Sequence, residues 1–152
     1  MLAMRVKLTI VLALILASPF VFNCATIRPP KHAHKTERTM IVTGYCKCAK
    51  CCGWRRNWRL RPTYVSGPNK GKRKKVGITA SGTKAKVGTI AADTALYPFG
   101  TVMYIPGYGY GRVEDRGGDI KGNRLDLYFK SHKDAMKWGK QTKKVKIWRP
   151  SK

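Results

Sequence analysis

The chain has 152 residues, enough for one compact domain and an N-terminal extension, and its 43% hydrophobic content excludes a disordered polycation. Lys and Arg number 32 against 7 Asp and Glu, which gives a formal net charge of +25. This excess says nothing about the fold. It indicates attraction to a polyanion: a nucleic acid, an anionic membrane face, or a wall polymer that carries carboxylates and phosphates.

Residues 1–25 carry the pattern of an exported chain. Arg5 and Lys7 give a basic start, and 15 uncharged residues follow at 8–22. This run is shorter than the roughly 20 residues of a membrane span, so it predicts a signal peptide, with an N-terminal membrane anchor as the alternative. The residues before Cys24 are similar to a lipobox, which leaves lipidation open. We expect an exported protein of the periplasm or cell envelope, attached to a membrane such as the outer membrane if the segment or Cys24 anchors it.

Four cysteines follow a predicted linker. Residues 26–39 are basic and contain Pro and His, which predicts a linker, and the β-branched run at 39–43 predicts the first strand of a domain at 40–150. Cys46, Cys48, Cys51 and Cys52 then lie within seven residues. In an exported protein this cluster favours two disulfides in one loop, with a structural Zn²⁺ on four thiolates as the alternative. Disulfides are favoured because structural zinc sites usually draw two pairs of ligands from separated segments.

The cysteines begin a basic insertion at 46–75. Arginines at 55–61 are interleaved with Trp54 and Trp58, and five more basic residues lie at 70–75. Such a mixture can bind single-stranded nucleic acid, stack on sugar rings or only add solvated charge. We expect no nucleic-acid partner, because the chain has an export pattern and no motif that reads bases.

The remaining chain predicts a mostly β fold. Turn residues recur every few positions from 77 to 122, with short β-rich segments between them at 87–92, 101–105, 111–114 and 124–129. Many short strands at close spacing predict a small barrel. One short helix is predicted near the C-terminus, capped by Ser131 and ended by Gly139, followed by a closing strand at 145–148.

The acidic residues are concentrated in this part of the chain. Five of the seven fall at 93–126, and Asp93, Asp115 and Asp126 lie at predicted strand or turn positions. Asp126 stands between Leu125 and Leu127, so its side chain points to the opposite face of a strand from the two leucines. A partly desolvated cleft there would raise its pKa and let it act as an acid near neutral pH.

Several ordered motifs carry a family resemblance. They are Gly-Tyr-Cys at 44–46, Thr-Ala-Ser-Gly-Thr at 79–83, Ile-Ala-Ala-Asp at 90–93, Pro-Phe-Gly-Thr at 98–101, Ile-Pro-Gly-Tyr-Gly at 105–109, Asp-Arg-Gly-Gly-Asp-Ile-Lys-Gly at 115–122 and Arg-Leu-Asp-Leu-Tyr at 124–128. From 40 to about 148 the chain closely resembles the three-aspartate (3D) domain family, whose aspartates map onto Asp93, Asp115 and Asp126. The resemblance implies a six-stranded double-psi β-barrel, related to the catalytic domain of membrane-bound lytic transglycosylase A.

The resemblance also implies an activity and a site. It implies a lytic transglycosylase that cleaves the bond between N-acetylmuramic acid and N-acetylglucosamine in peptidoglycan and leaves 1,6-anhydromuramyl ends. Asp126 would be the single acid and base, Asp115 would support the cleft, and Asp93 would help to tune the pKa and orient the sugar. The residues predicted to bind substrate are Lys121, Arg124, Tyr108 and Trp54.

Two other functions remain open. One is a glycosidase that hydrolyses the glycan with paired aspartates, and the other is a non-catalytic, expansin-like cell-wall-binding module. In each case we expect peptidoglycan glycan strands and anionic wall polymers or a membrane surface as partners, no cofactor and a monomeric protein.

Overall fold

The computed structural model describes residues 26–31 and 33–150. The predicted signal or anchor segment at 1–25, including Cys24, lies outside the described residues. Among the described residues, no helix has the length and apolar character needed to cross a membrane. The elements, in chain order, are β1 (Lys35–Tyr45), α2 (Ala49–Cys52), β2 (Trp54–Arg56), β3 (Pro62–Tyr64), β4 (Thr89–Ala92), β5 (Val102–Ile105), β6 (Gly109–Asp115), β7 (Arg124–Tyr128), α3 (His132–Trp138) and β8 (Gln141–Trp148).

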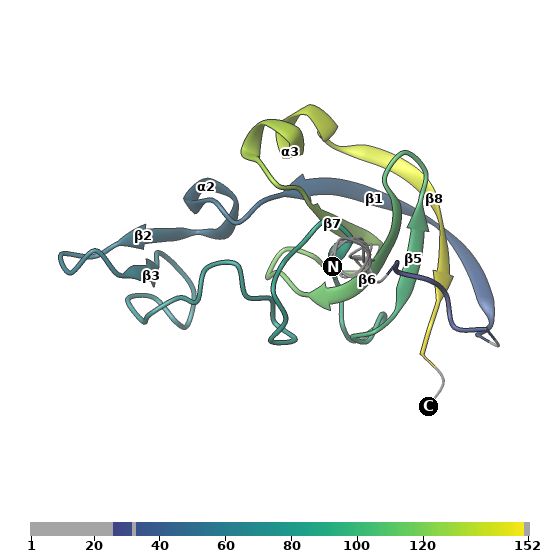
Figure 1. Ribbon diagram of the computed structural model, residues 1–152, viewed down its shortest axis with the longest axis horizontal. Helices are drawn as coiled ribbons and strands as arrows, with labels where there is room; N and C mark the ends of the chain where they lie inside the picture. Colours follow the sequence, from purple (N-terminus) through teal and green to yellow (C-terminus); the bar gives the residue numbers. More distant parts are fainter. Residues whose placement is uncertain (1–25, 32, 151–152) are drawn as a thin grey trace, which may run out of the picture.

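Six strands close into a barrel in the order β1-β7-β4-β6-β5-β8 (Figure 1). The consecutive strands β4 and β5 flank β6, and the consecutive strands β7 and β8 flank β1. Each set is a pair of successive strands with a third strand inserted between them, so the barrel contains two psi motifs. The pairs β1–β7 and β4–β6 are parallel, and the other neighbouring pairs are antiparallel. The predicted small double-psi barrel with a short helix near the C-terminus is confirmed.

The barrel interior is filled by alternate residues of each strand, as the two-residue period of a β-strand requires. Val42, Leu125 and Leu127 are fully buried in this core. Side chains at 43, 45, 126 and 128 therefore point to the outer face of β1 and β7. That outer face is where the candidate site forms.

A glycine lets α3 lie close against this part of the barrel. A Cβ at Gly44 would meet a ring carbon of Phe129 at 2.9 Å and the carbonyl oxygen of Ala135 at 3.0 Å. The absence of a side chain thus allows α3 to pack on β1. The helix occurs where the sequence predicts it, with the Ser131 hydroxyl accepting a hydrogen bond from the backbone N–H of Asp134.

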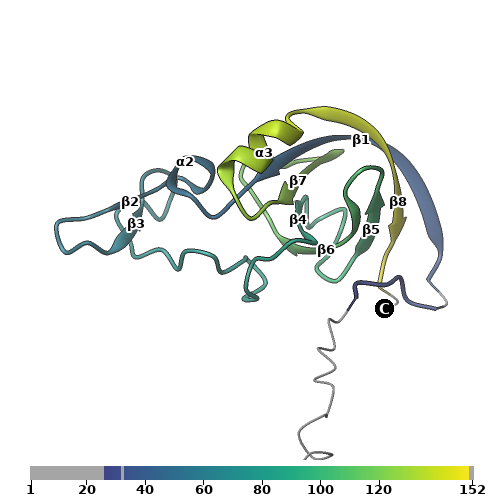
Figure 2. The ribbon, with the colours of Figure 1, turned by 45° about the horizontal axis from the view of Figure 1, so that its top comes forward.

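The insertion stands apart from the barrel. In both views the β2–β3 hairpin extends away from the six strands, and the single turn of α2 lies near the base of this arm (Figures 1 and 2). The turn of α2 was not predicted from the sequence.

β1 begins at Lys35, inside the segment 26–39 expected as a linker, because residues from Lys35 onward pair with β8.

Candidate functional site

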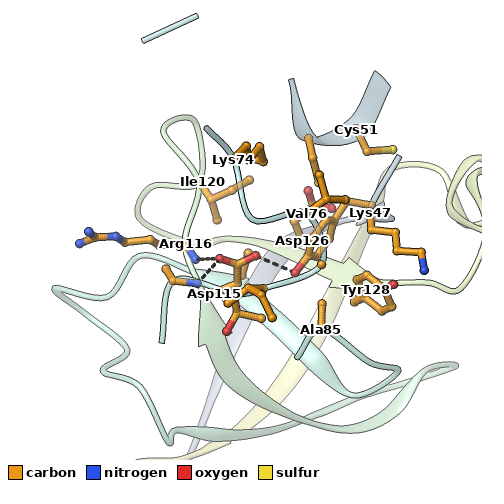
Figure 3. A pocket seen from close by; sticks show the side chains of 18 of the residues that line it. Lys47, Cys51, Lys74, Val76, Ala85, Asp115, Arg116, Ile120, Asp126 and Tyr128 are labelled. Carbon is orange, nitrogen blue, oxygen red and sulfur yellow. Dashed lines mark hydrogen bonds between the residues drawn. The ribbon is translucent and has the colours of Figure 1, made fainter. Parts of the chain in front are cut away.

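A cavity of about 540 Å³ separates the insertion from the outer face of the barrel. The barrel contributes the ends of β1, β6 and β7 together with the middle of β4. The insertion contributes residues of α2 and β3 together with Asn69 and Lys74, and the chain from 76 to 85 contributes further lining residues. Its lining includes Asp115, Asp126, Tyr45, Tyr128, Tyr64, Lys47, Lys74 and Arg116 (Figure 3). Two carboxylates, three tyrosines and three cations thus share one partly enclosed space.

The sheet register explains why two of the three aspartates meet. Ala91 in β4 pairs with Asp126 of β7 on one side and with Asp115 of β6 on the other. The β4–β6 register shifts by one residue after Ile90, and this irregularity brings Asp115 rather than Glu114 opposite Ala91. With neighbouring strands about 4.8 Å apart, the two aspartates stand two strands apart on one face, above the small side chain of Ala91.

Asp126 is partly buried and its acidity is altered. The pKa of its carboxyl is raised to about 6, mainly by burial and also by the nearby Asp115, whereas the Thr43 hydroxyl and Arg124 lower it. The Thr43 hydroxyl lies 3.0 Å from Oδ1 of Asp126 and 3.2 Å from the carbonyl oxygen of Leu125. The predicted upward shift is confirmed, and near pH 6 the group can both give and take a proton.

Asp115 is held in a different way. Its Oδ2 accepts a hydrogen bond from the Tyr45 hydroxyl at 2.9 Å, and its Oδ1 accepts bonds from the backbone N–H groups of Ala80 and Arg116, each at 2.9 Å (Figure 3). Burial, followed by the charge of Asp115, raises the pKa of Tyr45 far above its usual range, so Tyr45 remains a donor. Three hydrogen bonds therefore fix the orientation of the Asp115 carboxylate.

Asp93 is not brought to the cavity. Its Oδ2 accepts a hydrogen bond from the backbone N–H of Gly122 at 3.0 Å, and its Oδ1 accepts one from the N–H of Ala95 at 3.2 Å. These backbone bonds, led by the one from Gly122, lower the pKa of Asp93. Asp93 does not appear among the groups that shift Asp126. Asp93 thus links the turns that contain Ala95 and Gly122. This position does not fit the role of tuning the pKa of Asp126 that we expected from the sequence.

The four residues predicted to bind substrate also lie outside the cavity lining. Tyr108 is used inside the fold: its hydroxyl donates to the carbonyl of Tyr128 at 2.8 Å and accepts from the N–H of Gly88 at 2.9 Å. The indole N–H of Trp54 donates to the carbonyl of Lys47 at 3.1 Å. Arg124 is exposed, and its charge lowers the pKa of Asp126. The charge of Lys121 lowers the pKa of Asp93.

The cysteines lie at the rim of the same cavity. Cys51 and Cys52 are among its lining residues. In the part of the chain that the structure describes, Cys46, Cys48, Cys51 and Cys52 are all free thiols. The imidazole of His132, at the start of α3, lies beside two of them.

Several residues of the site were not singled out from the sequence. Tyr45 and Thr43 precede the cysteines on β1, where only their alternation with Val42 indicated that they point away from the core. Ala80 acts through its backbone N–H, which no side-chain pattern can reveal. Lys74 belongs to the charged segment that we treated only as part of the insertion.

Comparison with known proteins shows what the C-terminal part of the chain is similar to. Residues 88–149 match the family model of the 3D domain. This segment is similar to the 3D domain family. Two curated relatives are from Bacillus subtilis strain 168. The cell wall-binding protein YocH is 42% identical over 77 residues, which are 47% of this chain and 26% of the relative. The putative cell wall shaping protein YabE is 39% identical over 75 residues, which are 47% of this chain and 18% of the relative. The chain thus spans about a quarter or less of these relatives.

Solved structures similar to the chain include two of MltA from E. coli. One is 20% identical, with a TM-score of 0.41, and the match covers 53% of this chain and 30% of that one. The other, with bound chitohexaose, is 18% identical with a TM-score of 0.41, and the match covers 49% and 28%.

Proposed function

We propose that this protein acts on bacterial peptidoglycan and cleaves its glycan strands as a lytic transglycosylase, with Asp126 as the single catalytic acid and base. One observation carries the proposal: a partly buried carboxyl with a pKa of about 6 faces a cavity large enough for sugar rings. The choice of substrate is supported by the two relatives, which are named for binding and shaping the cell wall. The export pattern at 1–25 supports action in the cell envelope.

The proposed reaction needs one proton donor and no water. Protonated Asp126 gives its proton to the oxygen that links N-acetylmuramic acid to N-acetylglucosamine, and the bond from this oxygen to the anomeric carbon of the muramic acid breaks. The Asp126 carboxylate then takes the proton of the muramic acid 6-hydroxyl as that oxygen bonds to the anomeric carbon. Asp126 ends protonated again, and the product carries a 1,6-anhydro ring. A pKa near 6 suits both proton transfers.

Single-carboxylate chemistry is favoured over hydrolysis by paired aspartates. Hydrolysis would need a second carboxylate in the cavity to activate water or to attack the sugar. Asp115 is held in place by three hydrogen bonds from within the protein, and Asp93 lies outside the cavity. Asp115 instead holds Tyr45 and adds negative charge that keeps Asp126 protonated to higher pH.

The cavity charge fits an anionic wall polymer. Lys47, Lys74 and Arg116 line it. Peptidoglycan carries carboxylates on its peptide stems, and on its lactyl groups where the stem has been removed. Tyr64 and Tyr128 also line the cavity, and the ammonium of Lys74 lies over the Tyr64 ring at 4.3 Å from its centroid. The exposed arginines of the β2–β3 arm extend this positive surface away from the barrel.

Digestion of purified sacculi by the full-length protein tests the proposal. Mass spectrometry should find anhydromuramyl ends released by the parent protein, and release should fall about 10²- to 10⁴-fold in Asp126→Asn. Asp119→Asn is the matched control, because Asp119 is exposed and absent from the cavity lining, so this variant should retain its activity. New reducing ends would favour a hydrolase. Binding to sacculi without release of fragments would favour the wall-binding module and refute the catalytic assignment.

A further inference from the structure

Three cysteine sulfurs and one imidazole nitrogen gather beside the cavity, which Cys51 lines. Cys46, Cys48, Cys51 and His132 each place one ligand atom so that all four atoms lie within 4.8 Å of one another. Cys46 is buried and the other three are partly buried. The three cysteines come from the loop after β1 and the start of α2, whereas His132 is the first residue of α3.

The barrel brings these two distant segments together. β1 and β7 are parallel neighbours with Tyr45 opposite Tyr128, so the chain leaves both strands at the same end of the barrel. A backbone bond from the N–H of Phe129 to the carbonyl of Tyr45 extends the pairing by one residue. The segments that follow the two strands, the cysteine loop and α3, must then meet. A zinc site with ligands from separated segments becomes available in this way.

We infer that Cys46, Cys48, Cys51 and His132 form a structural Zn²⁺ site. Tetrahedral Zn²⁺ binds thiolate sulfur at about 2.3 Å and imidazole nitrogen at about 2.0–2.1 Å, which places two sulfurs about 3.8 Å apart and a sulfur and a nitrogen about 3.6 Å apart. The Sγ atoms of Cys46 and Cys51 are 3.8 Å apart. Nδ1 of His132 lies 3.7 Å from Sγ of Cys48 and 3.3 Å from Sγ of Cys51.

Backbone hydrogen bonds to the sulfurs support thiolate ligands. The N–H of Cys48 donates to Sγ of Cys46 at 3.5 Å, and the N–H of Cys51 donates to Sγ of Cys48 at 3.4 Å. Such bonds stabilise metal-bound thiolates and orient them. Three thiolates and one Zn²⁺ carry a net charge of −1, which the exposed Lys47 and Lys50 within the same loop offset.

The fourth cysteine lies outside the ligand set. Cys52 donates from its thiol to the carbonyl oxygen of Cys46 at 3.1 Å, and it is absent from the group of four ligands. Two disulfides in the loop would instead use all four cysteines and leave His132 without a role. A sulfur-rich set of four protein ligands fits Zn²⁺ and leaves no coordination position for substrate, which makes the site structural.

The bound metal would stabilise one wall of the cavity. Cys51 is both a ligand and a lining residue, so the metal would fasten the base of the insertion to α3 beside Tyr45 and Tyr128. Removal of the metal should loosen this wall while the barrel core remains intact. Hydrogen exchange should therefore increase at 46–54 and remain unchanged in β4 and β6.

Metal analysis of the full-length protein tests the inference. Protein purified without chelator and under reducing conditions should contain one zinc per chain, and replacement with Co²⁺ should give the strong visible absorption of a tetrahedral thiolate site. After removal of the metal, denaturation and alkylation without reductant should label all four cysteines of the loop. A protein that binds neither metal after reduction, or whose loop cysteines are already oxidised, would overturn the inference.

Matched variants identify the ligands. Cys48→Ser and His132→Ala should each weaken zinc binding by more than the 10- to 100-fold that loss of a supporting second-shell contact typically costs. Cys52→Ser should keep one zinc per chain, since the hydroxyl can replace the thiol as a donor to Cys46. Equal loss of zinc in Cys52→Ser and Cys48→Ser would show that the ligand set is wrong. These measurements do not depend on glycan cleavage, so they are independent of the proposed enzyme activity.

Discussion

Replacement of Asp126 by Asn is expected to stabilise the protein, and to do so increasingly as the pH rises. The Asp126 carboxyl has a pKa of about 6 in the folded chain, against an ordinary value of 3.8. Between these values the folded state holds the proton and the unfolded state releases it, so stability falls as the pH rises through the folded pKa. A difference of about two pKa units corresponds to about 3 kcal/mol. Asn carries no charge and does not suffer this loss.

The free energy of unfolding measures the effect. Relative to the parent, Asp126→Asn should be more stable by about 1 kcal/mol at pH 4.5 and by about 3 kcal/mol at pH 8. For a chain of this size the second figure corresponds to a rise of roughly 6–12 °C in the melting temperature. Urea titrations followed by tryptophan fluorescence at the two pH values provide both differences. The difference between variant and parent cancels the contributions of other titrating groups.

A matched control isolates the role of burial. Asp119→Asn removes one carboxylate from the exposed loop beside the cavity and should change stability by no more than about 0.5 kcal/mol at either pH. The reasoning is refuted if Asp126→Asn differs from the parent by the same amount at both pH values, or if it is the less stable protein at pH 8. Either result would mean that the Asp126 carboxyl is not desolvated by the fold.

Three further predictions concern the same surface. Asp115→Asn should cost about 1–3 kcal/mol of unfolding free energy in denaturant titrations, because Tyr45 and two backbone donors lose a charged acceptor. It should also move the pH profile of glycan cleavage downward, since the charge of Asp115 helps to raise the pKa of Asp126. Asp93→Asn should leave that profile unchanged, and a loss of cleavage equal to that of Asp126→Asn would place Asp93 in the site after all. Binding to sacculi should weaken steeply between 0.05 and 0.5 M salt in pelleting assays, because exposed charges are screened over roughly 8 Å at physiological ionic strength. Binding that does not change with salt would indicate aromatic stacking instead.

Local patterns in the sequence were sufficient for the six barrel strands, for α3 and for the direction of Asp126, but not for α2 or the β2–β3 hairpin. The alternation of Leu125, Asp126 and Leu127 puts the leucines in the core and the carboxyl on the other face, because side chains of a strand alternate. Ser131 and Gly139 bound α3 because a helix end needs partners for its free backbone groups. These features depend only on neighbours along the chain.

The site itself depends on the order of strands in the closed barrel. Asp115 and Asp126 share one face because β4 separates their strands and its register shifts at Ile90. Asp93 has the same residue type and a similar strand-end position, yet the fold turns it toward the backbone of Gly122.

The partners of the key side chains lie far apart in the chain. Tyr45 and Asp115 are separated by 70 positions, and Cys51 and His132 by 81. No local pattern joins such pairs. The sequence by itself therefore determined the six barrel strands, α3 and the outward direction of the catalytic candidate. Only the tertiary structure decided which groups surround it, because the closure of the barrel brings the ends of β1, β6 and β7 to the same cavity.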